Sequence, residues 1–305
     1  MKRSSETSPA AHELLRYALD NWRFYYEKNM TKEFVVFLVI TFGLTWGIAA
    51  IHILFPDQIT SLFGDLSMSN PLFILAVYSP GFSGVLLVWQ TYGLKGLGNF
   101  FRRLTLWQGP WWGWVFTILG IPVLMYLGAA LKGAVSEPFP FSPWYQVLPT
   151  LSLALFLGPI EEFGWRGYAL PLLQRRFAPF WTGLILGAIW MTWHIPAFLI
   201  GGTPQSAWSF APYFVGGVAA SLILTVLFND FRGSLLIAVL FHFQMNNPIW
   251  PDAQPWDNYL LALIAVAIIW SQRHTLFQRG LGITDIHMPG QEDRVSLSKP
   301  VGGRE

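Results

Sequence analysis

The stretch from Gly158 to Tyr168, GPIEEFGWRGY, decides how the rest of this chain is interpreted. It places two adjacent carboxylates, Glu161 and Glu162, and the guanidinium of Arg166 within a long apolar segment. A charge at the centre of a membrane helix costs roughly 2.5–3.5 kcal/mol on insertion scales. Three charges in such a segment therefore indicate a functional site, because a purely structural membrane helix would carry apolar side chains there.

The composition of the whole chain indicates a polytopic membrane protein. Of its 305 residues, 53% are hydrophobic and 12% are charged, whereas soluble domains carry about 25% charged residues. The 16 tryptophans and 10 tyrosines are typical of the aromatic belts at the two membrane–water interfaces. The chain has no cysteine, which excludes disulfides, thiolate zinc sites and a cysteine nucleophile.

Eight apolar spans predict an all-α protein with eight transmembrane helices. Most of them approach the roughly 20 residues that a helix needs to cross the hydrocarbon core. The last is short, and the fourth is expected to continue past the two glutamates. We place the spans at Phe34–Phe55, Pro71–Tyr92, Trp111–Leu131, Trp144–Ile160, Pro179–Ile200, Ala211–Phe228, Ser234–Trp250 and Asn258–Gln272.

The spans divide the chain into three parts. Residues 1–33 form an amphipathic N-terminal segment, residues 34–272 the membrane domain, and residues 273–305 a C-terminal tail. Within the first part, residues 12–29 favour a helix that either lies along the membrane surface or leads into the first span.

The basic residues predict the orientation of these spans. All but one of the 19 lysines and arginines fall in the N-terminal segment, the tail, or the connections after spans 2, 4 and 6. Lys132 alone falls on the other side. The positive-inside rule then places both termini in the cytosol. We expect an integral multi-pass protein of a bacterial inner or plasma membrane, with lipid around it and no nucleic-acid partner.

A few further polar residues lie in the apolar spans. Glu161 and His194 are about equally far from the turn expected near residues 177–179, so antiparallel helices would bring them to the same depth. His242 and Asn246 are four residues apart and share a helix face. These side chains predict a cavity formed by spans 4, 5 and 7, within the membrane and reachable from the cytosolic side. His52 has no partner in this pattern and is interpreted as structural.

This set of side chains is suited to hydrolysis of a carbonyl compound. Glu161 would take a proton from an attacking water and later give it to the leaving amine. Arg166, one turn from Glu162, would keep Glu162 ionised and leave Glu161 free to carry the proton. His242 and Asn246 would donate hydrogen bonds to the developing oxyanion.

Zinc offers an alternative mechanism. Glu161, His194 and His242 would then bind the metal and leave its fourth position to water. The sequence lacks the helical zinc motif in which two histidines stand four residues apart, so such a site would be assembled from separate helices. No cofactor is fixed by the sequence, and zinc is the one candidate.

Three motifs in chain order resemble one known family. They are Glu161-Glu162-x-x-x-Arg166, Trp190-x-x-x-His194 and His242-x-x-x-Asn246. The pattern resembles the CAAX-protease and bacteriocin-processing (CPBP) family of intramembrane proteases, which includes the type II CAAX prenyl endopeptidases. The resemblance covers about residues 140–250. One departure is Trp190, where the family usually has phenylalanine.

The resemblance implies roles for these residues. Glu161 and His194 would activate the water, and His242 and Asn246 would stabilise the oxyanion or serve as metal ligands, since the family is labelled metalloprotease. The substrate would be a peptide or protein, either a prenylated CAAX-type chain or another bacterial peptide. The implied activity is that of an intramembrane endopeptidase.

Two functions of other classes compete with proteolysis. Buried Glu and His also mark proton relays, but a proton-coupled transporter would show inverted repeats, whereas here the polar residues gather in spans 4, 5 and 7. A non-proteolytic scaffold or immunity protein would keep the fold without using Glu161. Taken singly, the Glu162–Arg166 pair is also typical of a structural ion pair, and His194 of a hydrogen-bonding strut between helices.

Overall fold

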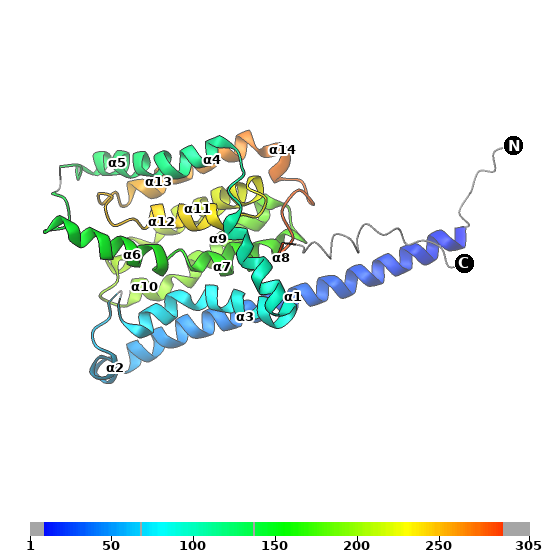
Figure 1. The fold of residues 1–305 in the computed structure, drawn as a ribbon, viewed down its shortest axis with the longest axis horizontal. Coiled ribbons are helices and arrows are strands. Elements are labelled where there is room, and N and C mark those ends of the chain that lie inside the picture. The colour runs from blue at the N-terminus through cyan, green and yellow to red at the C-terminus, as the bar shows by residue number, and fades with distance from the viewer. Residues whose placement is uncertain (1–8, 68, 137, 289–305) are drawn as a thin grey trace.

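The computed structural model describes residues 9–67, 69–136 and 138–288, with side chains from Thr31 onward. Residues 1–8 of the predicted N-terminal segment and residues 289–305 of the predicted tail lie outside these ranges. Every regular element in the described ranges is helical, as predicted (Figure 1). The α-helices are α1 Pro9–Leu54, α2 Pro56–Phe63, α3 Pro71–Phe101, α4 Trp111–Val115, α5 Ile121–Lys132, α6 Val147–Leu157, α7 Glu161–Gly164, α8 Leu170–Gln174, α9 Pro179–Trp193, α10 Ile195–Leu199, α11 Phe210–Asp230, α12 Leu235–Met245, α13 Trp256–Ser271 and α14 Arg273–Leu276.

Six helical segments of the described chain are long and apolar enough to cross a membrane, so the protein is an integral multi-pass protein. They are Thr31–Leu54, Pro71–Thr105, Trp111–Lys132, Trp144–Gln174, Pro179–Leu199 and Phe210–Asp230. These segments correspond to the first six predicted spans. The positions of the seventh and eighth hold the shorter apolar helices α12 and α13, so a total of eight spans stays a prediction.

The first helix is longer than the sequence analysis expected. α1 runs without a break from Pro9 to Leu54. The helix expected over residues 12–29 is therefore the first half of α1 rather than a separate element. Figure 1 shows this half projecting beyond the helical bundle.

The fourth span is interrupted directly before Glu161 and Glu162. α6 ends at Leu157 and α7 begins at Glu161, with a turn between them. Pro159 contributes to the break because it has no backbone N–H to donate within a helix. The span then continues to Gln174, as predicted, through a π-helical turn at Trp165–Ala169, a wider turn that is frequent at functional sites. Glu161 and Glu162 thus begin a new helix.

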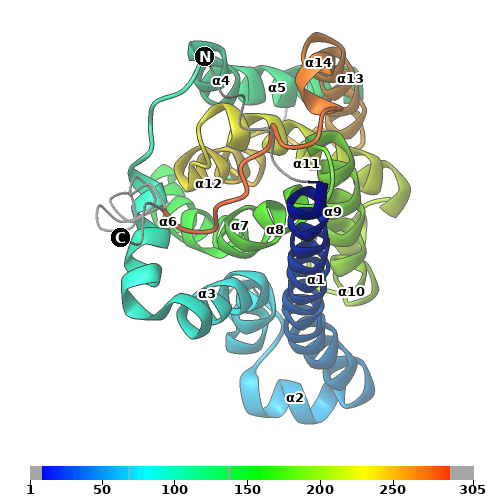
Figure 2. The ribbon, with the colours of Figure 1, turned by 90° about the vertical axis from the view of Figure 1, so that its right-hand side faces the viewer.

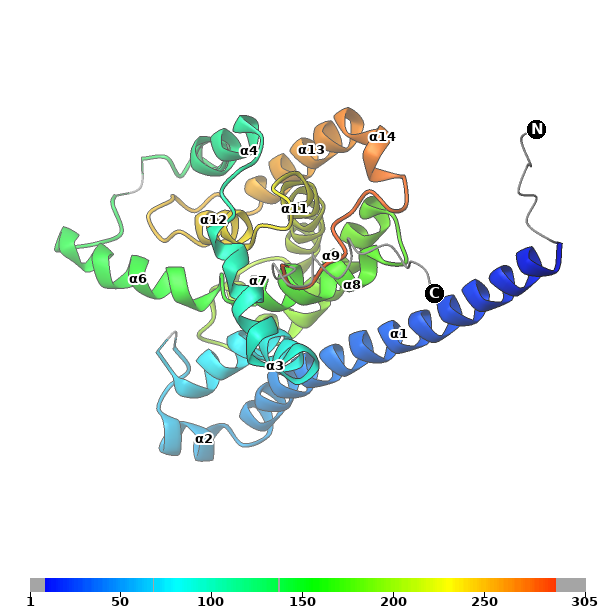
Figure 3. The same cartoon turned by 45° about the vertical axis from the view of Figure 1, so that its right-hand side comes forward.

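Glycines allow α3 to touch the backbone of α7, and Figure 3 shows α3 between α1 and α7. A Cβ atom added at Gly84 would lie 2.9 Å from the Cα of Gly164, and one added at Gly164 would overlap the carbonyl oxygen of Pro80. This contact fixes the position of the short helix that carries both glutamates.

Gly164→Ala is expected to destabilise the fold because the new methyl group forces α3 and α7 apart. Overpacking of this kind costs about 1–3 kcal/mol, which lowers the melting temperature by roughly 2–12 °C in a protein of this size. Thermal unfolding in detergent measures the change. Gly98→Ala on the exposed side of α3, where an added Cβ meets nothing within 4 Å, is the matched control. A melting temperature equal to that of the control would contradict the backbone contact.

The connections between helices gather at two ends of the bundle. One end, here called the terminal end, holds the connections 102–110, 175–178 and 231–234 and the segment from α14 to residue 288. The other, here called the far end, holds the connections 55–70, 133–146, 200–209 and 246–255. Figure 1 shows α2 and the beginning of α6 at the far end and α14 at the terminal end. Figure 2 looks onto the terminal end.

Polar side chains tie the terminal end together. Arg103 is buried and donates hydrogen bonds to the carbonyl oxygens of Gly167, Gly233 and Ile286, at 2.7–2.9 Å. Gln174 donates to the Ile283 carbonyl at 2.8 Å. The chain after α14, which the sequence analysis assigned to the tail, is therefore held across the ends of α3, α8 and α11.

Candidate active site

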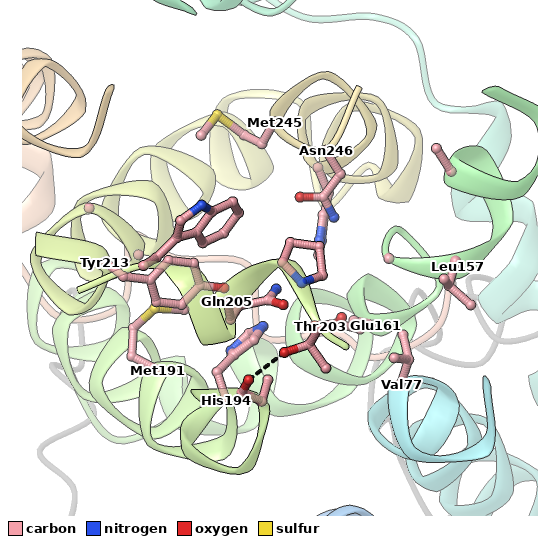
Figure 4. Close-up of a pocket in the computed structure, with 18 of the residues that line it drawn as sticks. Val77, Leu157, Glu161, Met191, His194, Thr203, Gln205, Tyr213, Met245 and Asn246 are labelled. Carbon is pink, nitrogen blue, oxygen red and sulfur yellow. Dashed lines mark hydrogen bonds between the residues drawn. The ribbon is translucent and has the colours of Figure 1, made fainter. Parts of the chain in front are cut away.

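A cavity of about 520 Å³ lies in the far half of the bundle, and its walls include Glu161, His194, His242 and Asn246. Glu161 begins α7, His194 caps the end of α9, and Asn246 caps the end of α12, which also carries His242. Figure 4 shows Glu161, His194 and Asn246 facing the same space. The structure thus brings the four predicted catalytic residues to one cavity, and α1, α3, α11 and α13 complete its walls.

Glu162 lies at the centre of a buried charged group. It is fully buried, and Arg166 Nη1 lies 3.1 Å from each of its carboxylate oxygens. His242 Nδ1 lies 2.7 Å from Glu162 Oε1, a contact between separate helices that the sequence analysis missed. Because a carboxylate accepts hydrogen bonds, Nδ1 of His242 carries a hydrogen and its Nε2 is left for other partners.

Glu161 has different surroundings although it is the next residue in the chain. Trp190 Nε1 donates a hydrogen bond to its Oε2 at 2.9 Å. Among the described residues, no other donor forms a hydrogen bond with this carboxylate, and only 4% of the residue is exposed. One glutamate is therefore neutralised by a guanidinium, whereas the other keeps Oε1 open to the cavity.

The Trp190 side chain contacts four polar residues of the site, namely Glu161, Arg166, His194 and His242. The guanidinium carbon of Arg166 lies 4.4 Å from the ring centroid of Trp190, a cation–π contact. The ring centroids of His242 and His194 lie 5.5 and 5.6 Å from that of Trp190. From the sequence, Trp190 was noted only as a departure from the phenylalanine that the family usually has. The signal passed over is the indole N–H, a donor that the phenylalanine usual at this position cannot supply.

His194 is oriented by the helix that it terminates. Its Nδ1 lies 2.9 Å from the carbonyl oxygen of Trp190. A carbonyl only accepts, so this nitrogen carries the hydrogen and Nε2 of His194 is left as a hydrogen-bond acceptor.

The predicted pair of oxyanion donors faces the break in the fourth span. A Cβ atom added at Gly158 would overlap Asn246 Nδ2 and lie 3.1 Å from His242 Nε2. The absence of a side chain at Gly158 therefore leaves space beside both nitrogens. Hydrogen-bond donors directed at one point are the arrangement that stabilises a developing oxyanion.

The cavity lies toward the far end of the bundle, and its access from the cytosolic side stays a prediction. The cavity walls include Leu66, Gln205, Trp208 and Pro251 from the far-end connections, and no described residue of the terminal-end connections. α9 ends at Trp193, and the short helix α10 continues the fifth predicted span to Leu199. His194 therefore lies at the junction of α9 and α10.

Zinc does not fit the arrangement of the side chains. In the parts of the chain that the structure describes, no three His, Asp or Glu side chains gather closely enough to hold a metal ion. Zinc needs three or four ligands at about 2.0–2.3 Å.

Further polar side chains that the sequence analysis did not select also line the cavity. The ring centroid of Tyr213 lies 5.5 Å from that of His194, and Gln205 lies on the same wall (Figure 4). His52, interpreted as structural, contributes to the wall from α1. Gln205 belongs to an expected connection, where nothing in the sequence distinguishes it from other polar loop residues.

Two comparisons bear on this site. Residues 143–247 match the family model described as type II CAAX prenyl endopeptidase Rce1-like. A curated relative, CAAX prenyl protease 2 of Methanococcus maripaludis, is 29% identical over 182 residues, which cover 54% of this chain and 67% of the relative. The matched segment contains every residue from Glu161 to Asn246 that forms the site described above.

Proposed function

Because residues 143–247 match the family model of the type II CAAX prenyl endopeptidase Rce1-like proteins, and because the chain is similar to a curated CAAX prenyl protease 2, we propose that this chain is a membrane peptidase that uses a water molecule activated by Glu161. The observation that carries this mechanism is the contrast between the two adjacent glutamates. Glu162 is held by Arg166 and His242, whereas Glu161 accepts a single neutral hydrogen bond and faces the cavity.

The reaction would begin with water between Glu161 and His194. One hydrogen of the water points to Oε1 of Glu161 and the other to Nε2 of His194, the acceptor left free by its bond to the Trp190 carbonyl. As the water oxygen bonds to the substrate carbonyl carbon, Glu161 takes the first proton. His194 orients the water and stays neutral.

The second half of the reaction would use the other side of the cavity. The tetrahedral oxyanion accepts hydrogen bonds from Asn246 Nδ2 and from Nε2 of His242, which carries a proton when the imidazole is charged beside Glu162. The carbon–nitrogen bond then breaks, and Glu161 gives its proton to the leaving amine. Every proton taken from water is thus placed on one of the two products.

The substrate would be a peptide or protein, with or without a prenyl group. Apolar residues of α1 and α3, among them Ile48, Ala49, Ala76 and Val77, line one wall of the cavity and would accept an alkyl chain. The test is cleavage of a quenched fluorescent peptide library, in farnesylated and unmodified forms, by purified protein in liposomes. Cleavage that Glu161→Gln abolishes supports the mechanism, and an intact library after incubation with the wild-type protein contradicts it.

Trp190→Phe is expected to lower kcat while leaving KM within about threefold. Phenylalanine keeps a ring beside Arg166 and both histidines, but it removes the hydrogen bond that holds Oε2 of Glu161. A hydrogen bond to a charged group contributes about 1.5–3 kcal/mol, which corresponds to a loss of roughly 10- to 150-fold in rate. Steady-state kinetics with the cleaved peptide measures both constants.

Trp193→Phe is the matched control for this substitution. Trp193 lies on the same helix, is equally buried, and donates its indole N–H to Thr45 Oγ1 at 2.8 Å. It therefore reports what the loss of a buried indole N–H does when Glu161 is not the acceptor. Equal losses of kcat in the two variants would show that the bond to Glu161 has no special role.

A further inference from the structure

The active-site cavity has carboxylates in its walls but no strongly basic side chain. The described residues that line it include Glu161, Asp252 and Asp257 and neither a lysine nor an arginine. A cleft lined by charge of one sign attracts ligands of the opposite sign. Glu161 is the proposed base, and Asp252 is paired with Lys132 at 2.5 Å. The carboxylate of Asp257 is therefore the one in these walls that has no role so far.

Two amide side chains hold the carboxylate of Asp257 in place. Gln254 Nε2 donates to its Oδ2 at 2.9 Å, and Asn258 Nδ2 donates to its Oδ1 at 3.2 Å and to Gln254 Oε1 at 2.7 Å. Only 6% of Asp257 and 5% of Asn258 is exposed. No Lys, Arg or His of the described residues forms an ion pair with this carboxylate. A buried charge is costly unless it is paired, so this one in a cavity wall points to a cationic ligand.

The three side chains of Gln254, Asp257 and Asn258, here called the Asp257 group, lie close to His194. The ring centroid of Tyr213 on α11 is 5.5 Å from that of His194 (Figure 4). Three residues further along α11, a Cβ atom added at Gly216 would overlap Asn258 Oδ1. Three residues of an α-helix rise about 4.5 Å, and an extended peptide spans about 3.3 Å per residue. A substrate side chain within a few residues of the cleaved bond can therefore reach the Asp257 group.

From this placement we infer that the Asp257 group is a subsite for a basic side chain of the substrate, a lysine or an arginine near the bond that is cleaved. Ammonium and guanidinium groups carry only hydrogen-bond donors, and the oxygens of Asp257 accept. The apolar wall formed by α1 and α3 lies on another side of the bundle from α13 (Figure 2). The substrate would thus present an apolar group to one wall and a basic group to the other. That the ligand is a peptide rests on the proposed function.

The subsite is tested with quenched peptides that are identical except for one Lys, Ala or Glu, placed in turn at each position. At one position near the cleaved bond, we expect Lys to raise kcat/KM of the wild-type protein roughly 10- to 150-fold over Ala, the effect of a hydrogen bond to a charged group. Glu is expected to lower it, because like charges repel. Equal values for Lys and Ala at every position would overturn the inference and leave the proposed function standing.

Asp257→Asn keeps the shape of the side chain and is expected to remove the preference for Lys. Asp230→Asn, a carboxylate that does not line the cavity, is the matched control and is expected to keep it. Asp257 also lies in the first turn of α13, where an acidic side chain stabilises a helix, so the melting temperatures of both variants are measured. A preference that persists in Asp257→Asn, whatever its melting temperature, would assign Asp257 to helix stability alone and overturn the inference.

Binding to the Glu161→Gln variant separates this inference from the proposed function. Fluorescently labelled Lys and Ala peptides of the same series are titrated with the variant in detergent, and their anisotropy gives the dissociation constants. We expect tighter binding of the Lys peptide, and equal binding of both peptides by Glu161→Gln/Asp257→Asn. This difference, without cleavage of any peptide by the wild-type protein, would remove the proposed function and keep the subsite. Equal binding of both peptides by Glu161→Gln would overturn the subsite.

Discussion

Glu161→Gln is expected to lower kcat for peptide cleavage by roughly 10²- to 10⁴-fold, the usual effect of removing a general base. The amide has the shape of the carboxylate but cannot take the proton of the attacking water. Its carbonyl oxygen can still accept the Trp190 N–H, so the variant is expected to fold and to keep its melting temperature. Turnover of the quenched peptide and thermal unfolding on the same preparation measure the two quantities.

Asp230→Asn is the matched control for the change from carboxylate to amide. Asp230 lies at the terminal end of α11, where it accepts a hydrogen bond from Gln272 at 3.2 Å, and it does not line the cavity. We expect this variant to cleave at the wild-type rate. A wild-type rate in Glu161→Gln would show that another group activates the water.

Arg166→Met is expected to lower the melting temperature by roughly 10 °C. Arg166 and Glu162 are fully buried, and removal of one partner leaves an uncompensated charge in the interior. Breaking a buried ion pair in this way costs about 3–5 kcal/mol, and each kcal/mol corresponds to about 2–4 °C in a protein of this size. Thermal unfolding in detergent measures the loss.

The double variant Glu162→Leu/Arg166→Met separates the structural part of this effect from the functional part. It removes both charges, and apolar pairs replace buried ion pairs at little cost in stability. We expect it to melt well above Arg166→Met but to remain poorly active, because His242 has lost the acceptor of its Nδ1 hydrogen. A double variant as unstable as Arg166→Met, or one with the wild-type rate, would contradict the assignment of Glu162 as the residue that positions His242.

The sequence was sufficient to predict that the chain is helical and that Glu161, His194, His242 and Asn246 lie around one cavity. Charges within apolar spans are expensive, so the few that occur, such as Glu161 and Arg166, are informative even in a single sequence. Helical spacing predicted the contact between Glu162 and Arg166, because residues four apart share a face. The comparison with known proteins confirmed the family that the three motifs resemble.

The sequence alone could not predict which side chains of separate helices form hydrogen bonds with one another. The bond between Glu162 and His242 depends on how α7 and α12 are rotated about their axes, and the helix break after Leu157 sets that rotation for α7. The depth of His194 depends on where α9 ends, and no periodic pattern marks Trp193 as the last residue of that helix.

The hydrogen bond of Trp190 could not be predicted from the sequence for a different reason. An aromatic residue in an apolar span is easily interpreted from sequence as packing alone. The N–H of an indole contributes a hydrogen bond only when a specific acceptor lies within hydrogen-bond distance. Here that acceptor is Oε2 of Glu161, on a helix that approaches α9 from a distant part of the chain.

Activation of the water by Glu161 without a metal ion is tested by a comparison of wild-type protein and Glu161→Gln. Both are first depleted of metal with a chelator, and their metal content is measured. We expect metal-free wild-type protein to cleave the peptide at its original rate and metal-free Glu161→Gln to be slower by roughly 10²- to 10⁴-fold. Loss of wild-type cleavage on depletion, with recovery on addition of zinc, would contradict this mechanism.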